Sequence, residues 1–148
     1  MLPYHPDLGG RIAGQSGQIF TNVAELNGAP GVDDDGNGYD DDAHGWDFVD
    51  LGSGSGIPAG EDWDLEDNDP NDWGGHGTAV AGTATASSDN GTGVASPAWG
   101  CRLMPLRVSD TNGYGYGSTI SKALTWAADH GARVANVSFQ MTLSAAVN

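Results

Sequence analysis

A single histidine lies where a glycine-rich turn leads into a run of small residues. His76 follows Gly74 and Gly75, and residues 77–86 read GTAVAGTATA. If a helix begins here, its first turn places His76 near the positive end of the helix dipole, which favours a neutral imidazole. A neutral imidazole can take a proton from a hydroxyl group, so His76 is a candidate general base.

The small residues of this run also carry structural information. Each glycine inside a helix costs about 1 kcal/mol relative to alanine, so the segment is not optimised for helix formation. We therefore expect a thin helix that packs closely against neighbouring strands. The alternative is a histidine with an ordinary structural role at the start of a helix.

A second group of residues that could do chemistry is acidic. Residues 33–42 read DDDGNGYDDD, with oxygen-bearing side chains at alternate positions before Gly38. This matches the first half of an EF-hand calcium loop, in which such side chains converge on one cation and the glycine permits a sharp bend. The twelfth position holds His44 in place of glutamate, so we expect a calcium loop without flanking helices, with a solvated acidic turn as the alternative. The candidate ligands are Asp33, Asp35, Asn37, Tyr39 through its carbonyl group, and Asp41.

The charge of the chain is strongly one-sided. With 20 acidic and 5 basic residues, its net charge is −15, which makes nucleic acids and anionic membranes poor partners. The aspartates are clustered, and this clustering favours bound cations. At 148 residues the chain has the size of one domain.

Composition sets three further expectations. No stretch is apolar for long enough to span a membrane, and the first residues lack the basic start and apolar core of a signal peptide. The one cysteine, Cys101, cannot form an internal disulfide. Because Cys101 lies next to an apolar segment, we expect a buried thiol.

Short apolar segments predict strands at residues 45–49, 102–109 and 133–139. Residues 118–130 predict a helix with one apolar face, capped by Ser118 and stopped by a glycine. The last two strands and this helix would form a right-handed crossover in a parallel sheet. We therefore expect an α/β fold, and we assign no chemistry to this helix.

The histidine segment resembles a known motif. Residues 75–82 read GHGTAVAG, and the subtilisin-like serine proteases, or subtilases, carry G-H-G-T-x-V-A-G around their catalytic histidine. Residues 5–8 read HPDL, which resembles a segment that follows the catalytic aspartate in this family. The resemblance extends from His5 to about Phe139 and implies that residues 1–148 are a fragment of a single subtilisin-like peptidase domain. It implies a partial three-layer α/β fold with a mostly parallel sheet.

The resemblance assigns catalytic and substrate-binding roles. His76 is the triad base, while the aspartate motif would precede the chain and the nucleophile motif G-T-S-M-A would follow it. Serine, histidine and aspartate act as a unit, so we expect negligible peptidase activity from this chain alone. Residues 114–117 and residues 138–140 would flank a bound peptide and pair with it as strands. The second segment usually reads S-L-G-G in the family, and Phe139-Gln140 departs from that sequence. The candidate substrate-binding residues are Gly115, Gly117 and Ser138.

The resemblance also implies two further calcium sites. One joins the aspartate of HPDL to the loop at residues 87–94, where an ordinary Asn-Gly turn is the alternative. Its candidate ligands are Asp7 and Asn90 through their side chains, and Ser87, Thr92 and Val94 through their carbonyl groups. The other site precedes the histidine motif, and its candidate ligands are Asp47, Asp50, Asp69 and Asp72.

Together these features predict a calcium-binding part of a serine endopeptidase that acts on peptides and proteins. A non-catalytic calcium-binding or interaction module is the alternative. In subtilases the strand that carries the catalytic aspartate is central in the sheet, so its neighbours here would have open edges. We therefore expect a homodimer, a domain-swapped assembly or a partner chain. Family members are expected to be extracellular.

Overall fold

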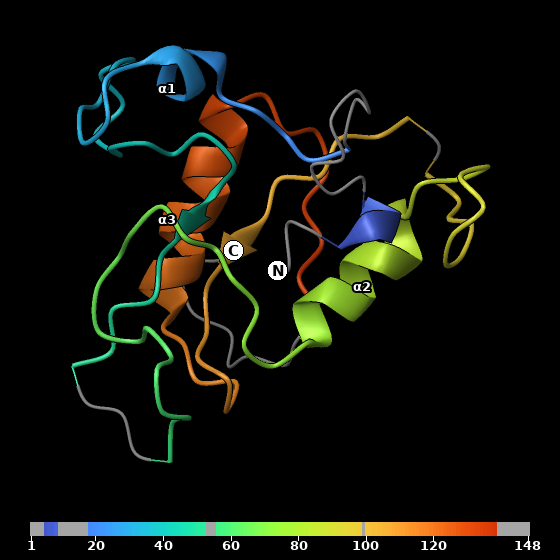
Figure 1. Cartoon of the computed structure of the whole chain (residues 1–148). Coiled ribbons are helices and arrows are strands. Elements are labelled where there is room, and N and C mark those ends of the chain that lie inside the picture. Colours follow the sequence, from blue (N-terminus) through green and yellow to red (C-terminus); the bar gives the residue numbers. More distant parts are fainter. Residues whose placement is uncertain (1–4, 9–17, 53–55, 99, 139–148) are drawn as a thin grey trace.

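The computed structural model describes residues 5–8, 18–52, 56–98 and 100–138. Its elements are short and are joined by long loops (Figure 1). None of the described helices is both long enough and apolar enough to cross a membrane. In chain order the elements are η1 (Pro6–Leu8), α1 (Val23–Asn27), β1 (Trp46–Asp47), α2 (His76–Thr85), β2 (Leu106–Arg107) and α3 (Gly117–Asp129).

The two strands form a parallel sheet. Its register pairs Trp46 of β1 with Leu106 of β2. A separate parallel bridge joins Ile19 to Leu103, just before β2. Parallel pairing, together with the helices, confirms the α/β prediction.

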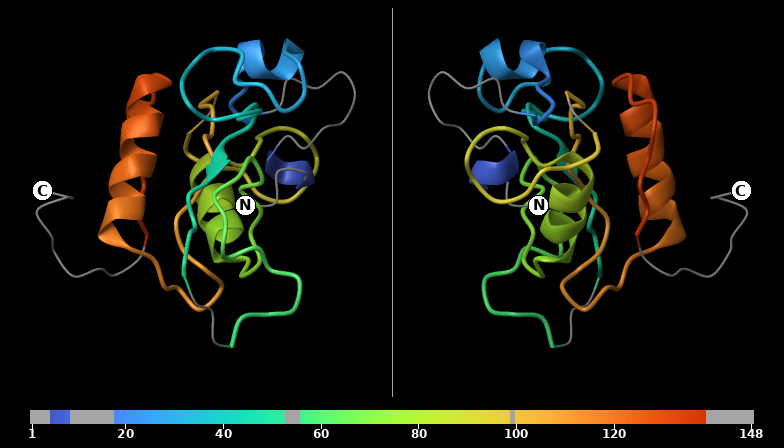
Figure 2. Two further views of the ribbon diagram at one scale, coloured as in Figure 1. Left: turned by 90° about the vertical axis from the view of Figure 1, so that its left-hand side faces the viewer. Right: turned by 90° about the vertical axis from the view of Figure 1, so that its right-hand side faces the viewer.

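The main core lies between this sheet and α3, which forms one flank of the molecule (Figure 2). Ala123, Trp126 and Ala127 are buried with Trp46 and Phe48. Spacings of three and four residues place the three helical side chains on one face. Burial of a large apolar side chain contributes about 1.5–3 kcal/mol, so this contact anchors α3. The periodicity predicts Ile120, Leu124 and Ala127 or Ala128 on the apolar face; Ile120 and Ala127 are buried, whereas Leu124 is half-buried and Ala128 is exposed.

A smaller core joins α2 to the N-terminal part of the chain. Ala81 of α2 and Leu8 of η1 are buried together, with Ile19 and Leu103 packed against them. The small side chain of Ala81 permits η1 to lie close to the helix (Figure 1). Close packing is shown at Ala81, and the partner is η1 rather than the expected strand. Of the residues of α2 only Ala81 and Thr85 are buried, and nothing lies within 4 Å of a Cβ atom placed at Gly82.

Buried charges lie on the other face of β1, because successive side chains of a strand point to opposite sides. Arg107 is the register partner of Asp47 and contacts its carboxylate, and Nη2 of Arg107 lies 2.6 Å from Oε1 of Glu61. Glu61 also accepts hydrogen bonds from the N–H and hydroxyl groups of Thr111. Burial raises the pKa of Asp47 to about 7, although the Val49 N–H and the Arg107 charge act in the opposite direction.

The segment at residues 45–49 is buried throughout, and β1 covers two of its residues. Asp47 forms an antiparallel bridge with Asp67, and the N–H of Leu51 donates to the carbonyl of Trp63 at 3.0 Å. The segment that contains Trp63 and Asp67 therefore pairs with the chain at and after β1.

The predicted strand at residues 133–139 is wrong for its described part. Residues 133–138 form neither helix nor strand, and Val134 is 87% exposed. Phe139 lies outside the described residues. The described sheet has only two strands, so no neighbour satisfies the backbone of this segment. The strand–helix–strand crossover is therefore not formed within the described residues.

Two local predictions are also wrong. Ser118 does not cap α3, because Tyr116 is the N-cap residue and no side-chain cap bond forms. The thiol of Cys101 is exposed rather than buried. The backbone N–H of Cys101 donates to the carbonyl of Ala98 at 3.2 Å. Cys101 therefore lies in a turn that precedes the largely apolar residues 103–108.

Replacement of Arg107 with methionine should strongly destabilise the fold. The change leaves Asp47 and Glu61 buried without their cation, and removal of one partner of a buried ion pair costs about 3–5 kcal/mol. Urea unfolding at neutral pH, followed by circular dichroism, measures this loss. Lys122→Met is the matched control, since Lys122 and Glu66 form an exposed pair that contributes about 0–1 kcal/mol. Equal losses in both variants would contradict a structural role for the buried cluster.

Candidate functional site

His76 is the first residue of α2. The preceding Gly75 has a φ of 78°, a left-handed conformation that favours glycine. The imidazole is exposed, and no described carboxylate forms an ion pair with it. The turn therefore presents His76 at the helix N-terminus, where the sequence predicts it.

The backbone on both sides of His76 is held by Asp72. Its Oδ1 accepts hydrogen bonds from the N–H groups of Gly74 at 3.1 Å and Gly75 at 2.7 Å. Its Oδ2 accepts from the N–H and hydroxyl groups of Thr78, both at 2.7 Å. Burial opposes ionisation of Asp72, but the hydrogen bonds from Thr78 and Gly75 outweigh it and lower the pKa. Asp72 therefore acts as a cap for α2.

The residues predicted around Asp7 come together from distant parts of the chain. The carboxylate of Asp7 is buried; its Oδ1 accepts from Nδ2 of Asn90 at 3.3 Å and its Oδ2 from the N–H of Val94 at 2.9 Å. The N–H of Ser87 donates to the carbonyl of Asp7 at 2.6 Å. Thr92 joins through its N–H, which donates to Oδ1 of Asn90 at 3.0 Å. The structure thus brings all five candidate residues to one place, but through their N–H groups, so the predicted ligand roles of the Asn90 oxygen and of the three carbonyl groups stay predictions.

Gly93 permits this close approach. Its φ is 57°, and a Cβ atom at this position would lie 2.1 Å from Oδ2 of Asp7. A side chain here would displace the carboxylate or the loop. The requirement for glycine therefore follows from both backbone conformation and space.

The acidic loop at residues 33–42 wraps around the carboxylate of Glu25, which the sequence analysis did not select. Oε1 of Glu25 accepts from the N–H groups of Asp34 at 2.8 Å and Asp35 at 3.0 Å, and Oε2 accepts from that of Asp41 at 2.9 Å. Glu25 is buried on α1. No spacing rule for calcium loops includes a residue so far before the loop, so the sequence pattern could not identify it.

The carboxylate of Asp33 binds the backbone of its own loop. It accepts from the N–H groups of Gly36 at 2.7 Å, Asn37 at 3.1 Å and Gly38 at 2.8 Å. The hydrogen bond from Gly38 is the main reason that the pKa of Asp33 is lowered. Oxygens of Glu25, Asp33 and Asp35 all lie within 4.8 Å of one another, an arrangement that could hold a hard cation.

Three candidates from this loop lie outside that group of carboxylates. Oδ1 of Asn37 accepts from the N–H of Tyr39 at 2.8 Å, so the ligand role of Asn37 also stays a prediction. Oδ2 of Asp41 accepts from the N–H of Gly31 at 2.6 Å. The ring of Tyr39 packs edge-on against Trp46, with centroids 5.0 Å apart. The proposed ligand roles of Asp41 and of the Tyr39 carbonyl stay predictions.

The four candidates for the site before the histidine motif have separate surroundings. Asp47 pairs with Arg107, and Asp72 caps α2. Asp50 and Asp69 are exposed. Among the described residues, none of the four belongs to a group of three metal-capable side chains, so this site stays a prediction.

The candidate substrate-binding residues also stay predictions. Gly115 lies so close to β2 that a Cβ atom would be 2.2 Å from the carbonyl oxygen of Val108. Gly117 is the first residue of α3. Ser138 is exposed, and its hydroxyl accepts from Nδ2 of Asn136 at 2.8 Å.

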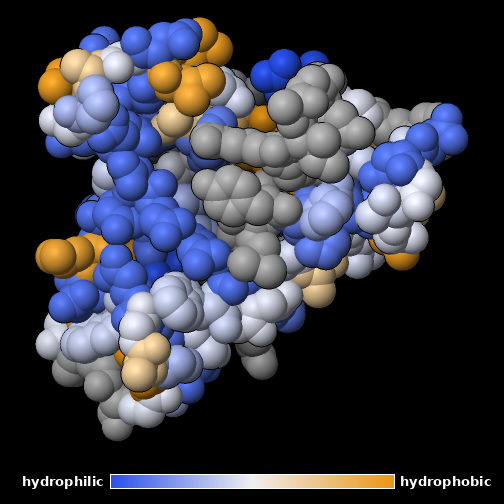
Figure 3. Space-filling view, in the orientation of Figure 1, coloured by the Kyte–Doolittle hydropathy of each residue, from blue (hydrophilic) through white to orange (hydrophobic). Residues whose placement is uncertain are grey.

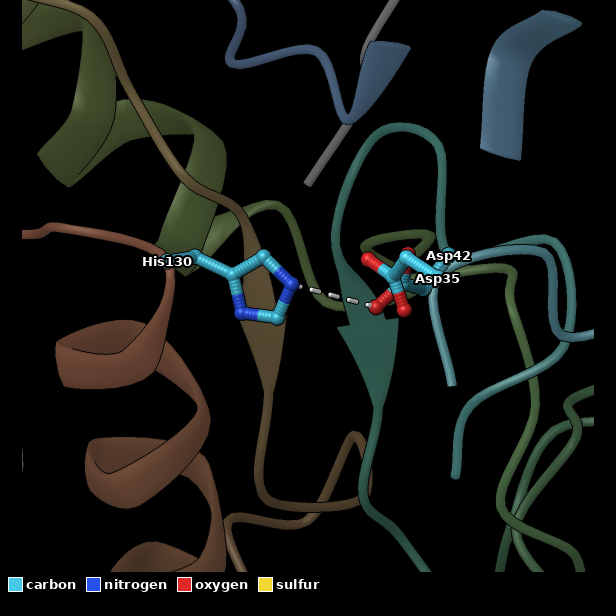
Figure 4. A group of neighbouring side chains, drawn as sticks. All are labelled: Asp35, Asp42 and His130. Atoms are coloured by element: carbon cyan, nitrogen blue, oxygen red, sulfur yellow. Dashed lines mark ion pairs between the residues drawn. The ribbon is translucent and has the colours of Figure 1, made fainter. Parts of the chain in front are cut away.

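A further group, which the sequence analysis missed, joins the acidic loop to the end of α3 (Figure 4). Asp35, Asp42 and His130 each offer one ligand atom within 4.8 Å of the others. Nε2 of His130 lies 3.6 Å from Oδ2 of Asp42. His130 is the C-cap residue of α3, so its distance from the loop in sequence left no local signal for this association.

The comparisons with known proteins agree with the histidine motif. The family model described as the subtilase family matches residues 3–148. The chain belongs to the subtilase family. This confirms the resemblance and gives the chain a serine-protease-like origin.

Three relatives show how much of a subtilase is matched. The chain is 44% identical over 94 residues to a thermophilic serine proteinase from a Bacillus species, and 40% identical over 83 residues to thermitase from Thermoactinomyces vulgaris. It is 35% identical over 105 residues to an extracellular basic protease from Dichelobacter nodosus. These matches cover 60%, 55% and 56% of the chain, but 23%, 30% and 16% of the relatives. The matched part therefore spans less than a third of each relative.

Replacement of Gly93 with alanine should destabilise this subtilase chain more than the same change at Gly91. Both glycines have positive φ, 57° and 68°, so alanine introduces similar backbone strain at each. Only at position 93 does the new Cβ meet Asp7; at Gly91 nothing lies within 4 Å. Thermal unfolding should show an additional loss of about 1–3 kcal/mol for Gly93→Ala. If both variants lose the same stability, the close approach of Asp7 is not required.

Proposed function

We propose that this chain supplies the catalytic histidine and calcium-binding loops of a serine endopeptidase that hydrolyses peptide bonds. In this role His76 takes the proton of a serine hydroxyl and later gives it to the leaving amine. The 148 residues contain no G-T-S-M-A motif. The nucleophile and the aspartate must therefore come from residues outside them, and the chain alone should be inactive.

One observation carries this proposal. α2 begins at His76 inside the motif that subtilases share, and the Asp72 cap fixes the turn that presents the ring. A general base must be accessible to the reacting hydroxyl, and the imidazole is exposed. Peptides and proteins are the corresponding substrates, with Gly115, Gly117 and Ser138 as proposed contacts.

Calcium binding is the second part of the proposal, and the donor chemistry supports it. The carboxylate of Asp7 lies against the loop at residues 87–94, where it accepts from Nδ2 of Asn90 and the N–H of Val94. Calcium binding here requires Asn90 to turn its side-chain oxygen, and Ser87, Thr92 and Val94 to turn their carbonyl groups, toward the ion. In the acidic loop, three carboxylates lie within 4.8 Å of one another. Calcium prefers such oxygen ligands, and its charge would offset the repulsion among them.

A non-catalytic interaction module is the alternative, and the exposed apolar residues favour it. Val23, Leu26 and Val32 are exposed near α1, where Figure 3 shows hydrophobic atoms on an otherwise hydrophilic face. Val134 and Val137 are exposed beside the short sheet. Open strand edges and apolar patches recruit other chains. We propose that a second copy, a swapped segment or a partner chain covers this surface.

An extracellular location fits both parts of the proposal. One relative is named an extracellular protease. Extracellular calcium sites work with dissociation constants of about 10⁻⁴–10⁻³ M, so the loops would be occupied there without high affinity.

Calcium should raise the melting temperature of the chain relative to the same sample in EDTA. Calcium at about 100 times its Kd adds about 2.7 kcal/mol to the stability. Asp33→Ala should reduce this shift, because Asp33 belongs to the group of three carboxylates. Asp40→Ala is the matched control, since it removes the same charge from an exposed position in the same loop. Equal shifts in both variants would exclude the acidic loop as the source.

The peptidase proposal predicts different activities for short and long chains. The 148 residues alone should not hydrolyse casein, whereas a chain that also carries the aspartate and serine motifs should. In the longer chain His76→Ala should lower kcat by about 10⁶-fold, while His5→Gln should retain activity. Inhibitor-sensitive hydrolysis by the short chain, or full activity after loss of His76, would overturn the proposed roles.

A further inference from the structure

We propose that Asp35, Asp42 and His130 form a site for a divalent transition-metal ion, with zinc as the best fit. The group shares Asp35 with the proposed calcium group of Glu25, Asp33 and Asp35, but one of its three ligands is an imidazole nitrogen. Imidazole suits zinc and its neighbours, whereas calcium takes six to eight oxygen ligands. Figure 4 shows the ring of His130 directed at the two carboxylates.

The nitrogen of His130 that faces the carboxylates carries a lone pair. Nδ1 lies 2.7 Å from the carbonyl oxygen of Trp126, which can only accept, so Nδ1 carries the hydrogen. Nε2 lies 3.2 Å from Nδ2 of Asn37. The Asn37 amide has a fixed orientation because its Oδ1 accepts from the N–H of Tyr39 at 2.8 Å. Nε2 is therefore the acceptor, and this is the tautomer that binds metals in proteins.

The position of the ring is also fixed. The imidazole stacks on Trp126 with centroids 3.9 Å apart and planes 23° apart, and Phe20 packs edge-on against it at 5.8 Å. The side chain of His130 is 12% exposed. Because the ring of His130 is already held in place, metal binding would cost little side-chain conformational entropy at this ligand.

Two amides hold the carboxylates together. Nδ2 of Asn22 donates to Oδ1 of Asp42 at 2.7 Å and to Oδ2 of Asp35 at 2.8 Å. Oδ2 of the fully buried Asp42 accepts from Nε1 of Trp126 at 2.8 Å and from Nδ2 of Asn37 at 2.9 Å. The contacts of Asn22 and Trp126 orient the carboxylates from outside the site, as the outer partners of metal ligands do.

The spacing of the ligands fits tetrahedral zinc. Two ligands about 2.0–2.2 Å from zinc at a tetrahedral angle lie about 3.3–3.5 Å apart. The observed separation between Nε2 of His130 and Oδ2 of Asp42 is 3.6 Å. The ligand atom of Asp35 lies within 4.8 Å of those of Asp42 and His130, and because Asp35 is exposed its side chain can move closer to the ion. Water would be the fourth ligand. The NH₂ group of Asn37 lies between His130 and Asp42 and must turn aside when the ion enters.

Titration of the metal-free chain with Zn²⁺ by calorimetry, and with Co²⁺ by visible absorption, tests this site. We expect one ion per chain and a tetrahedral cobalt spectrum. His130→Gln keeps an acceptor for Asn37 but removes the imidazole, and it should weaken binding by about 100-fold or more. The exposed His76 provides the matched control His76→Gln, which should bind zinc as the unaltered chain does.

Retained binding in His130→Gln, or equal loss in His76→Gln, would overturn the site. NMR provides a test that does not depend on folding of a variant: zinc should shift the ring signals of His130 and leave those of His76 unchanged. Asn37→Asp should tighten zinc binding because it replaces the NH₂ group with a carboxylate oxygen, and weaker binding would count against the site. Asp33→Ala should keep zinc binding while its calcium response falls, which separates failure of this inference from failure of the calcium proposal.

Discussion

Carboxylates that accept backbone N–H groups hold this structure together. Short helices and a two-stranded sheet leave many loop amides without partners from regular secondary structure, and each backbone N–H is a donor that seeks an acceptor. Glu25 and Asp33 provide these acceptors in the acidic loop, Asp72 provides them before α2, and Asp7 binds the loop after α2. The net charge of −15 therefore has a structural explanation that does not require a metal at every aspartate.

The same interaction explains why acidic side chains can lie close together. N–H and NH₂ groups point their positive ends at the carboxylates and lower the energy of the ionised forms. Asn22, for example, bridges Asp35 and Asp42 with one nitrogen. This shared donor holds the oxygens of the two carboxylates close together.

Sequence reasoning succeeded where the signal was local or carried by a family motif. The apolar periodicity of α3 predicted its buried face, and the histidine motif predicted that α2 would present His76. The family resemblance also predicted that Asp7 lies beside the loop at residues 87–94, and the structure has the two in contact. Glu25 and His130 were missed because each reaches the acidic loop through tertiary packing, and no spacing rule connects a helix on either side to that loop.

The strand predictions show the limit of local patterns most clearly. Residues 102–109 and 133–139 have similar apolar character, yet only the first segment forms a strand within the described residues, because β1 supplies its hydrogen-bond partners. Residues 133–138 lie on the side of β2 opposite β1 and have no described strand beside them (Figure 1). A strand depends on its neighbour as much as on its own sequence. The exposure of Val134 and Val137 therefore accompanies the lack of a neighbouring strand among the described residues.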